Sequence, residues 1–217
     1  MSKEKTMTRF DPFQTLELIK SRRTIRKFDY TRAVPEDALQ RVLEAGTWAP
    51  YSPYYIQGWK FIAFRGEARD TVASIIIRSR AILKYLRYMY EHSPYGAEHE
   101  SWEEHEWKEY AHEFAKNLGN APVIILGFVP KDPHPTIRFH LLASAFAASQ
   151  NMMLQATAEG LGTGLISFKS PHLEAELVLT AGLEVDKWSF VFAMNLGYAA
   201  ERPSASPRQD GLIEIRG

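Results

Sequence analysis

Cysteine is absent from the 217-residue sequence, which excludes disulfide bonds, catalytic thiolates and thiolate metal sites. The sequence also lacks the run of about 18 apolar residues that a membrane-spanning helix needs, and its first residues lack the apolar stretch of a secretory signal. Net charge is missing as well, since 26 basic residues balance 26 acidic ones. We therefore expect a cytoplasmic protein with neither nucleic acid nor a membrane as a partner.

Several catalytic and binding motifs are missing too. There is no GxGxxG, GxxxxGK[ST] or HExxH pattern, no serine-histidine-aspartate order and no distinctive pair of carboxylates. Four histidines lie close together in the sequence, at positions 92, 99, 105 and 112. Because glutamates surround His105, we interpret this region as a solvent-exposed helical face and predict no metal site.

Hydrophobic periodicity predicts an α+β protein. Helices are expected over 12–22, 35–46, 67–92, 139–162 and 170–183, with Gly46 as the end of the second. Strands are expected over 59–66, 121–129, 163–168 and 188–199. Residues 131–138 are expected to be a connection, and the charged, aromatic stretch 93–117 a partly exposed helix or lid. The irregular alternation of helix and strand argues against a doubly wound sheet.

Three segments carry residues suited to ligand binding. The first is a cluster at a transition from helix to extended chain: Arg22, Arg23, Thr24 and Arg26. Guanidinium groups suit phosphate oxygens, but the helix dipole also favours cations at a helix C-terminus. The second is the tyrosine-rich loop within 48–61, which suits a flat aromatic ligand or surface packing. The third is 159–168, whose glycines admit a ligand near the backbone or end a helix.

The order and spacing of four blocks resemble the FMN-dependent nitroreductase family. The blocks are SRRTIRKF at 21–28, AVPEDALQRVLEAGTWAPYSPYYIQGWKF at 33–61, AASQNMMLQATAEGLGT at 147–163 and LGYAAERP at 196–203. The resemblance covers nearly all of the chain outside 67–120. It implies a central, mostly antiparallel sheet flanked by helices in an interlocked homodimer. Residues 1–217 would form one domain, with 67–120 as a helical lid or excursion and 199–217 as a tail wrapping the partner.

The same resemblance implies the residues that contact FMN. Arg22, Thr24 and Arg26 correspond to contacts with the phosphate, ribityl chain and pyrimidine ring, Arg23 to a neighbouring contact, and Arg208 to a second phosphate-binding arginine. Leu165, Ile166 and Ser167 correspond to the stretch beside the reactive N5 edge. The loop over the flavin, which the partner subunit supplies in this family, corresponds to Pro50, Tyr51, Ser52, Tyr55 and Gln57.

The loop departs from the family pattern. Its APYSPYYIQGW is one residue longer than APSxxNxQPW, Gly58 replaces a proline, and the asparagine that contacts the isoalloxazine has no counterpart, with Tyr55 nearest. We therefore expect the substrate side of the site, rather than the cofactor side, to be unusual. Aromatic residues of 85–117 either stack on an acceptor or pack between helices: Tyr85, Tyr88, Tyr90, Tyr95, Trp102 and Trp107.

The implied activity is an oxidoreductase that passes hydride from NADH or NADPH through flavin N5 to a small acceptor such as a nitroaromatic or quinone. No acid–base side chain is required. Two other kinds of enzyme on the same fold remain alternatives, a flavin-modifying enzyme and a reductive dehalogenase. In the dehalogenase reading, Glu91, Tyr95 and Lys116 would imitate the lid residues. A flavin-binding protein without turnover is a further alternative.

Overall fold

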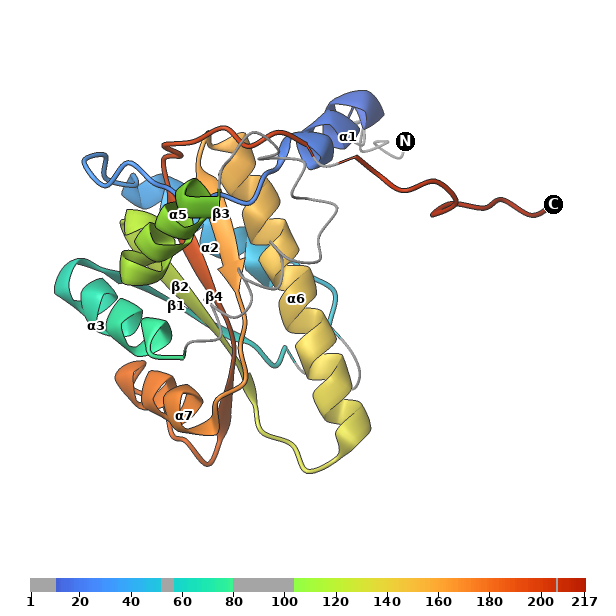
Figure 1. Ribbon diagram of the computed structural model, residues 1–217. Helices are drawn as coiled ribbons and strands as arrows, with labels where there is room; N and C mark the ends of the chain where they lie inside the picture. The colour runs from blue at the N-terminus through green and yellow to red at the C-terminus, as the bar shows by residue number, and fades with distance from the viewer. Residues whose placement is uncertain (1–10, 52–56, 80–103, 206) are drawn as a thin grey trace, which may run out of the picture.

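Helices and strands interleave irregularly along the chain, in the predicted α+β arrangement (Figure 1). The computed structural model describes residues 11–51, 57–79, 104–205 and 207–217. Its helices are α1 (Pro12–Ser21), α2 (Glu36–Thr47), α3 (Gly66–Ile77), α5 (Glu104–Asn117), the short 3-10 turn η2 (Leu118–Asn120), α6 (Pro135–Ala158) and α7 (Pro171–Thr180). Its strands are β1 (Lys60–Arg65), β2 (Val123–Pro130), β3 (Gly162–Ile166) and β4 (Trp188–Gly197). None of these described helices is long and apolar enough to cross a membrane.

The four strands form one antiparallel sheet in the order β1-β2-β4-β3, so β3 is an edge strand. β2 is apolar throughout because both of its faces are covered. Alternate residues of the strand belong to different core clusters, with Ile124 and Leu126 on one face and Val123 and Ile125 on the other. The chain therefore builds two hydrophobic layers around a single sheet.

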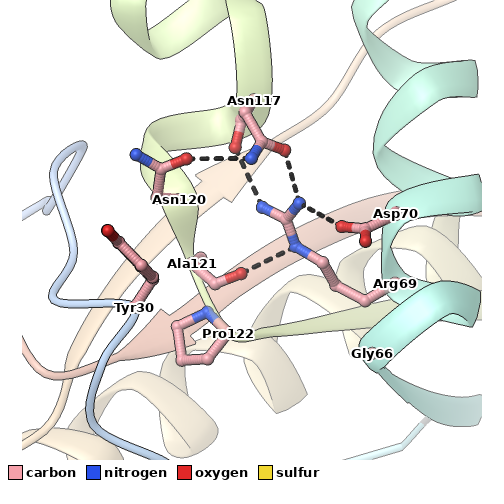
Figure 2. Close-up of a pocket in the computed structure, with 8 residues that line it drawn as sticks. All are labelled: Tyr30, Gly66, Arg69, Asp70, Asn117, Asn120, Ala121 and Pro122. Atoms are coloured by element: carbon pink, nitrogen blue, oxygen red, sulfur yellow. Dashed lines mark hydrogen bonds and ion pairs between the residues drawn. The ribbon is translucent and has the colours of Figure 1, made fainter.

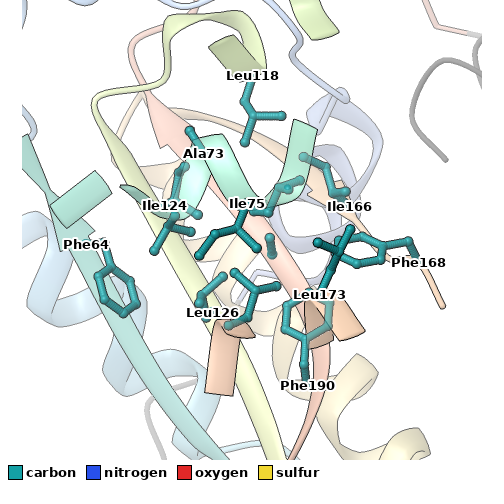
Figure 3. Packing of buried hydrophobic residues seen from close by; sticks show 14 of the residues in the cluster. Phe64, Ala73, Ile75, Leu118, Ile124, Leu126, Ile166, Phe168, Leu173 and Phe190 are labelled. Atoms are coloured by element: carbon teal, nitrogen blue, oxygen red, sulfur yellow. The ribbon is translucent and has the colours of Figure 1, made fainter. Parts of the chain in front are cut away.

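Helices α3, α5 and α7 cover one face of the sheet, and α2 and α6 cover the other (Figure 1). The first layer contains Ile75 of α3, Leu173 of α7 and the ring of Phe190, all packed against β2 (Figure 3). Thus α3, at the start of the 67–120 segment, is part of the core. In the second layer, α6 packs its Ala145 and Met152 against the sheet and against α2.

Three local expectations are corrected. The helix expected over 67–92 does not run unbroken, because α3 ends at Ile77 and a turn follows at 78–79. Gly46 does not end its helix, because α2 continues to Thr47 and Gly46 is buried against α6. A Cβ at this position would lie under 3.0 Å from the terminal methyl of Met152, so the glycine serves close packing of two helices. The connection 131–138 is also shorter than expected, since α6 already begins at Pro135, a residue whose fixed φ suits the first turn of a helix.

Candidate functional site

The segment after α1, residues 22–28, is here called the arginine arm. It leaves the helix at Arg22 and runs beside the edge strand β3. Thr24 forms a parallel bridge with Thr163, and the Ile25 N–H donates a 2.8 Å hydrogen bond to the Thr163 carbonyl. Farther along, Phe28 bridges to Ala199, just after β4. These bonds attach the arm to the sheet.

Two glycines of β3 permit this close approach. A Cβ on Gly162 would lie 2.7 Å from Cγ1 of Ile25, and one on Gly164 would lie under 3.0 Å from the Ile25 carbonyl oxygen. Gly160 has a different role: its φ of 73° places it in the left-handed region just after α6, which confirms the helix-ending interpretation for that glycine. The other two glycines make room for the arm itself.

Arg22 is half-buried at the end of α1, and the charges that act on it from the described residues are those of two other arginines. Burial is the main cause that lowers the pKa of its guanidinium, and repulsion from Arg23 and Arg208 lowers it further. Within the part of the chain that the structure describes, no carboxylate pairs with Arg22 or Arg208. Like charges drawn together from opposite ends of the sequence favour an anion between them.

Arg23 faces the helix that precedes it. Its Nη1 donates to the carbonyls of Lys20 and Arg22, at 2.5 Å and 2.9 Å. These carbonyls belong to the last turn of α1, where the dipole and the unpaired backbone oxygens favour a cation. The alternative that the sequence left open, a cation serving a helix end, therefore describes this residue of the cluster.

Arg26 lies in different surroundings from Arg22. Its backbone N–H and that of Lys27 donate to Oε1 of Glu201, at 2.5 Å and 3.1 Å. The Tyr110 hydroxyl of α5 donates to Oε2 of the same carboxylate at 2.9 Å. Burial and then the Glu201 charge raise the pKa of Tyr110 far above its usual value, while the Arg26 guanidinium acts in the opposite direction. Tyr110 therefore stays a protonated donor, and α5 is linked to the arm.

The remaining residues of the predicted site lie at the other end of β3 or on the loop before β1. Leu165 and Ile166 are in β3, with Ile166 buried, and Ser167 follows them exposed. Pro50, Tyr51 and Gln57 are exposed, and the Tyr51 ring meets the Trp59 ring edge-on at 6.0 Å. Ser52 and Tyr55 lie outside the described residues, as do the lid residues before position 104.

Sequence reasoning gave no role to two residues that organise this site, Glu201 and Tyr110. Glu201 lies inside the LGYAAERP block, yet nothing local indicates that its carboxylate reaches back to the arm across 175 positions. Tyr110 belongs to the charged, aromatic stretch that we interpreted as an exposed helix or lid. A half-buried tyrosine on such a helix carries no distinguishing local signal.

A model of the nitroreductase family matches residues 19–198. No curated protein matches the chain. Among solved structures, the FMN-dependent nitroreductase NfnB from Mycobacterium smegmatis, in complex with NADPH, is 20% identical with a TM-score of 0.71, covering 95% of this chain and 100% of that one. A Desulfovibrio desulfuricans protein assigned as a nitroreductase and solved with FMN is 26% identical with a TM-score of 0.65, covering 96% and 100%. A Bacteroides fragilis nitroreductase with bound FMN is 22% identical with a TM-score of 0.65, covering 94% and 99%. The chain thus belongs to the nitroreductase family of flavin oxidoreductases.

Proposed function

We propose that the protein binds FMN along the arginine arm and β3 and uses it to carry electrons from NADH or NADPH to a small nitroaromatic or quinone-like acceptor. The observation that carries the proposal is the arginine arm itself, which the 2.8 Å bond from the Ile25 N–H to the Thr163 carbonyl attaches to β3. At its start Arg22 is half-buried, the charges of Arg23 and Arg208 act on it, and no carboxylate pairs with it among the described residues. The FMN in the Desulfovibrio desulfuricans and Bacteroides fragilis structures and the NADPH in the NfnB structure support the same choice of ligands.

The residues of this chain fit such a cofactor. Arg22 and Arg208 would hold a phosphate dianion, whose charge offsets the repulsion between them. Thr24 stands beside the strand with a hydroxyl that suits a ribityl chain. From Thr163 to Ser167 the chain extends roughly 13 Å at the usual rise per residue of a strand. The 165–167 stretch could therefore line the far end of an elongated ligand whose phosphate lies at Arg22.

Bound FMN would supply the hydride chemistry, and the protein would supply binding and orientation. The arm would hold the phosphate, and the backbone of 165–167 would face the isoalloxazine ring, where the reaction takes place. No acid–base side chain is assigned, because hydride transfer between a nicotinamide and a flavin does not require one. The long loop at 51–58, with Gly58 in place of a proline, would shape the acceptor side.

We further propose that two copies of the chain form the active unit. Helix α1 buries none of its side chains and exposes Phe13 at 80%, Leu16 at 47% and Ile19 at 46%. The tail exposes Ile213 and Ile215 at 87% and 93% and extends away from the body of the subunit (Figure 1). Apolar surface of this extent is typical of an interface. A second copy would cover it and bring its 50–57 loop to the cofactor.

The purified protein is expected to be yellow or to become so with added FMN. Anaerobic NADPH or NADH should bleach the flavin bands, and a nitroaromatic or quinone should restore them, as followed by absorption spectroscopy and steady-state nicotinamide oxidation. Failure to bind added FMN would contradict the whole proposal. Binding without nicotinamide oxidation would contradict the reductase activity and favour a flavin-binding or flavin-modifying protein, while halide release from a haloaromatic would identify a dehalogenase.

Substituting Phe13 and Leu16 together with aspartate is expected to shift the protein from dimer toward monomer. Burying one large apolar side chain contributes about 1.5–3 kcal/mol, so the dimer dissociation constant should rise by about tenfold or more for each residue. Analytical ultracentrifugation measures the shift against the 24.8 kDa chain mass. Leu179→Asp is the matched control, because Leu179 is 64% exposed on the distant α7. Equal effects of both changes would contradict an α1 interface.

A further inference from the structure

The turn between α5 and β2 has an unusual backbone. Leu118, Gly119 and Asn120 have consecutive φ values of 50°, 68° and 59°. Three successive residues in the left-handed region are disfavoured, and two of them carry side chains. Such a turn persists only where surrounding contacts over-determine it. Those contacts come from α3 and β4, far away in the sequence.

Arg69 of α3 is the first of these contacts. Although it is charged, it is only 4% exposed. Its Nε donates to the Ala121 carbonyl at 2.7 Å and its Nη2 to the Asn117 carbonyl at 2.9 Å, so one guanidinium spans both ends of the turn (Figure 2). Its Nη1 donates to the side chains of Asn117 and Asp70. A planar fork can make these bonds at once, whereas a lysine ammonium cannot.

Asn195 of β4 is the second contact. It is fully buried within an apolar strand, and its Nδ2 donates to the Leu118 carbonyl at 2.9 Å. Its Oδ1 is buried with no hydrogen-bond partner among the described residues, a cost that a simple core position would avoid by using an apolar residue. In the sheet, Asn195 pairs with Gly164 of β3, the glycine against which the arm lies. The amide thus stands between the turn and the arm.

The turn at 118–120 also supports the arginine arm. The Phe28 N–H donates to the Gly119 carbonyl at 2.8 Å. The space beside Gly119 is occupied by Arg26, because a Cβ there would lie under 3.0 Å from the Arg26 carbonyl oxygen. The arm is therefore held by the turn and by Glu201 together.

We propose that Arg69 and Asn195 are positioning residues for the cofactor site. Neither would touch the ligand. Arg69 bonds to the carbonyls at both ends of the turn, and Asn195 bonds to the Leu118 carbonyl within it. The turn fixes the backbone of residues 26–28 and therefore the direction of the arm. The inference rests on the proposed FMN binding for its functional meaning, but the mechanical link from turn to arm exists in the ligand-free protein.

Gly119→Ala tests this link directly, with Gly182→Ala as its matched control. Both glycines have left-handed φ values, 68° and 70°, but a Cβ on Gly182, at the end of α7, would meet nothing within 4 Å. Both variants carry the same backbone strain, and only Gly119→Ala pushes on the arm. Hydrogen exchange of ligand-free protein, followed by mass spectrometry over residues 22–30 and normalised to a β2 peptide, should accelerate at least tenfold in Gly119→Ala alone.

An FMN titration of the same proteins gives the second readout. The dissociation constant should rise at least tenfold for Gly119→Ala and stay within twofold of wild type for Gly182→Ala. Wild-type protein that fails to bind FMN contradicts the proposed function but leaves the exchange result as a valid test of the link. Unchanged exchange over 22–30 in Gly119→Ala overturns the inference even where FMN binds.

Arg69→Lys covers the case in which Gly119→Ala does not fold. It keeps the charge and loses the fork, so exchange over 22–30 should again accelerate at least tenfold. Arg78→Lys is its control, since Arg78 is an exposed arginine at the end of the same helix. Equal exchange in the two lysine variants would overturn the role of Arg69. Asn195→Leu, which keeps the branched shape of the side chain and removes the donor, should repeat the effect of Arg69→Lys.

Discussion

Replacing Arg22 by alanine is expected to weaken FMN binding by about 10- to 150-fold. A hydrogen bond to a charged group contributes about 1.5–3 kcal/mol, and each 1.4 kcal/mol is about tenfold in a dissociation constant. Because Arg22 is half-buried beside two like charges, its removal should not destabilise the ligand-free protein. Weaker binding together with an unchanged or higher melting temperature would distinguish lost ligand contact from lost folding.

The controls for this experiment come from the same chain. Arg208→Ala should weaken binding in the same way, and the double variant should fall short of the sum because both arginines address one phosphate. Arg65→Ala should leave binding unchanged, since Arg65 lies on β1 at the opposite edge of the sheet and pairs with Glu36. If Arg22→Ala keeps the wild-type affinity for FMN, the assignment of Arg22 to the phosphate is contradicted. Arg65→Ala measures how much the loss of one positive charge, regardless of its position, changes FMN affinity.

Gly164→Ala is expected to produce the largest combined loss of stability and binding. The new methyl group would meet the Ile25 carbonyl oxygen, which is backbone and cannot turn aside. Overpacking of this kind costs about 1–3 kcal/mol, and the arm would have to move away from β3. Urea unfolding of ligand-free protein measures the first effect, and an FMN titration measures the second.

Gly46→Ala provides the contrast. The nearest atoms to its methyl group would all belong to the unbranched Met152 side chain, and an alanine inside a helix is favoured over glycine by about 0.8–1.0 kcal/mol. We therefore expect a net change within about 1 kcal/mol and no change in FMN affinity. Similar losses in the two variants would show that crowding at any buried glycine, rather than the position of the arm, determines the result.

Helices and strands with a clear local hydrophobic pattern could be predicted from the sequence. The apolar run of β2 and the long alanine-rich stretch of α6 predict their elements directly. β2 is buried almost throughout, whereas α6 buries one side and leaves Phe139 and Phe146 exposed. The end of α2 was placed almost correctly for the wrong reason. In a sequence, a glycine that ends a helix cannot be told from a glycine that lets a neighbouring helix approach. Only the structure, which places Met152 against Gly46, distinguishes the two roles.

The site was less predictable because its contacts are long-range. The sequence places Arg22, Thr24 and Arg26 in one cluster, but the charge of Arg208 acts on Arg22 whereas the Arg26 guanidinium acts on Tyr110. Nothing near position 69 indicates that its guanidinium binds carbonyls 48 and 52 residues away. The one available signal was Asn195, an amide inside the apolar run WSFVFAMNLG. A buried amide requires a partner, although the sequence does not say which.

The position of the arm on β3 has a consequence for solubility. An edge strand offers unpaired N–H and C=O groups to any other extended chain, and proteins cover such edges to prevent sheets from joining. Here the cover is the segment that we propose for cofactor recognition, held by the Ile25 bond to Thr163. A substitution that releases the arm would therefore expose the unpaired backbone groups of β3 to other chains. Selection for ligand binding and selection against aggregation thus act on the same seven residues, 22–28.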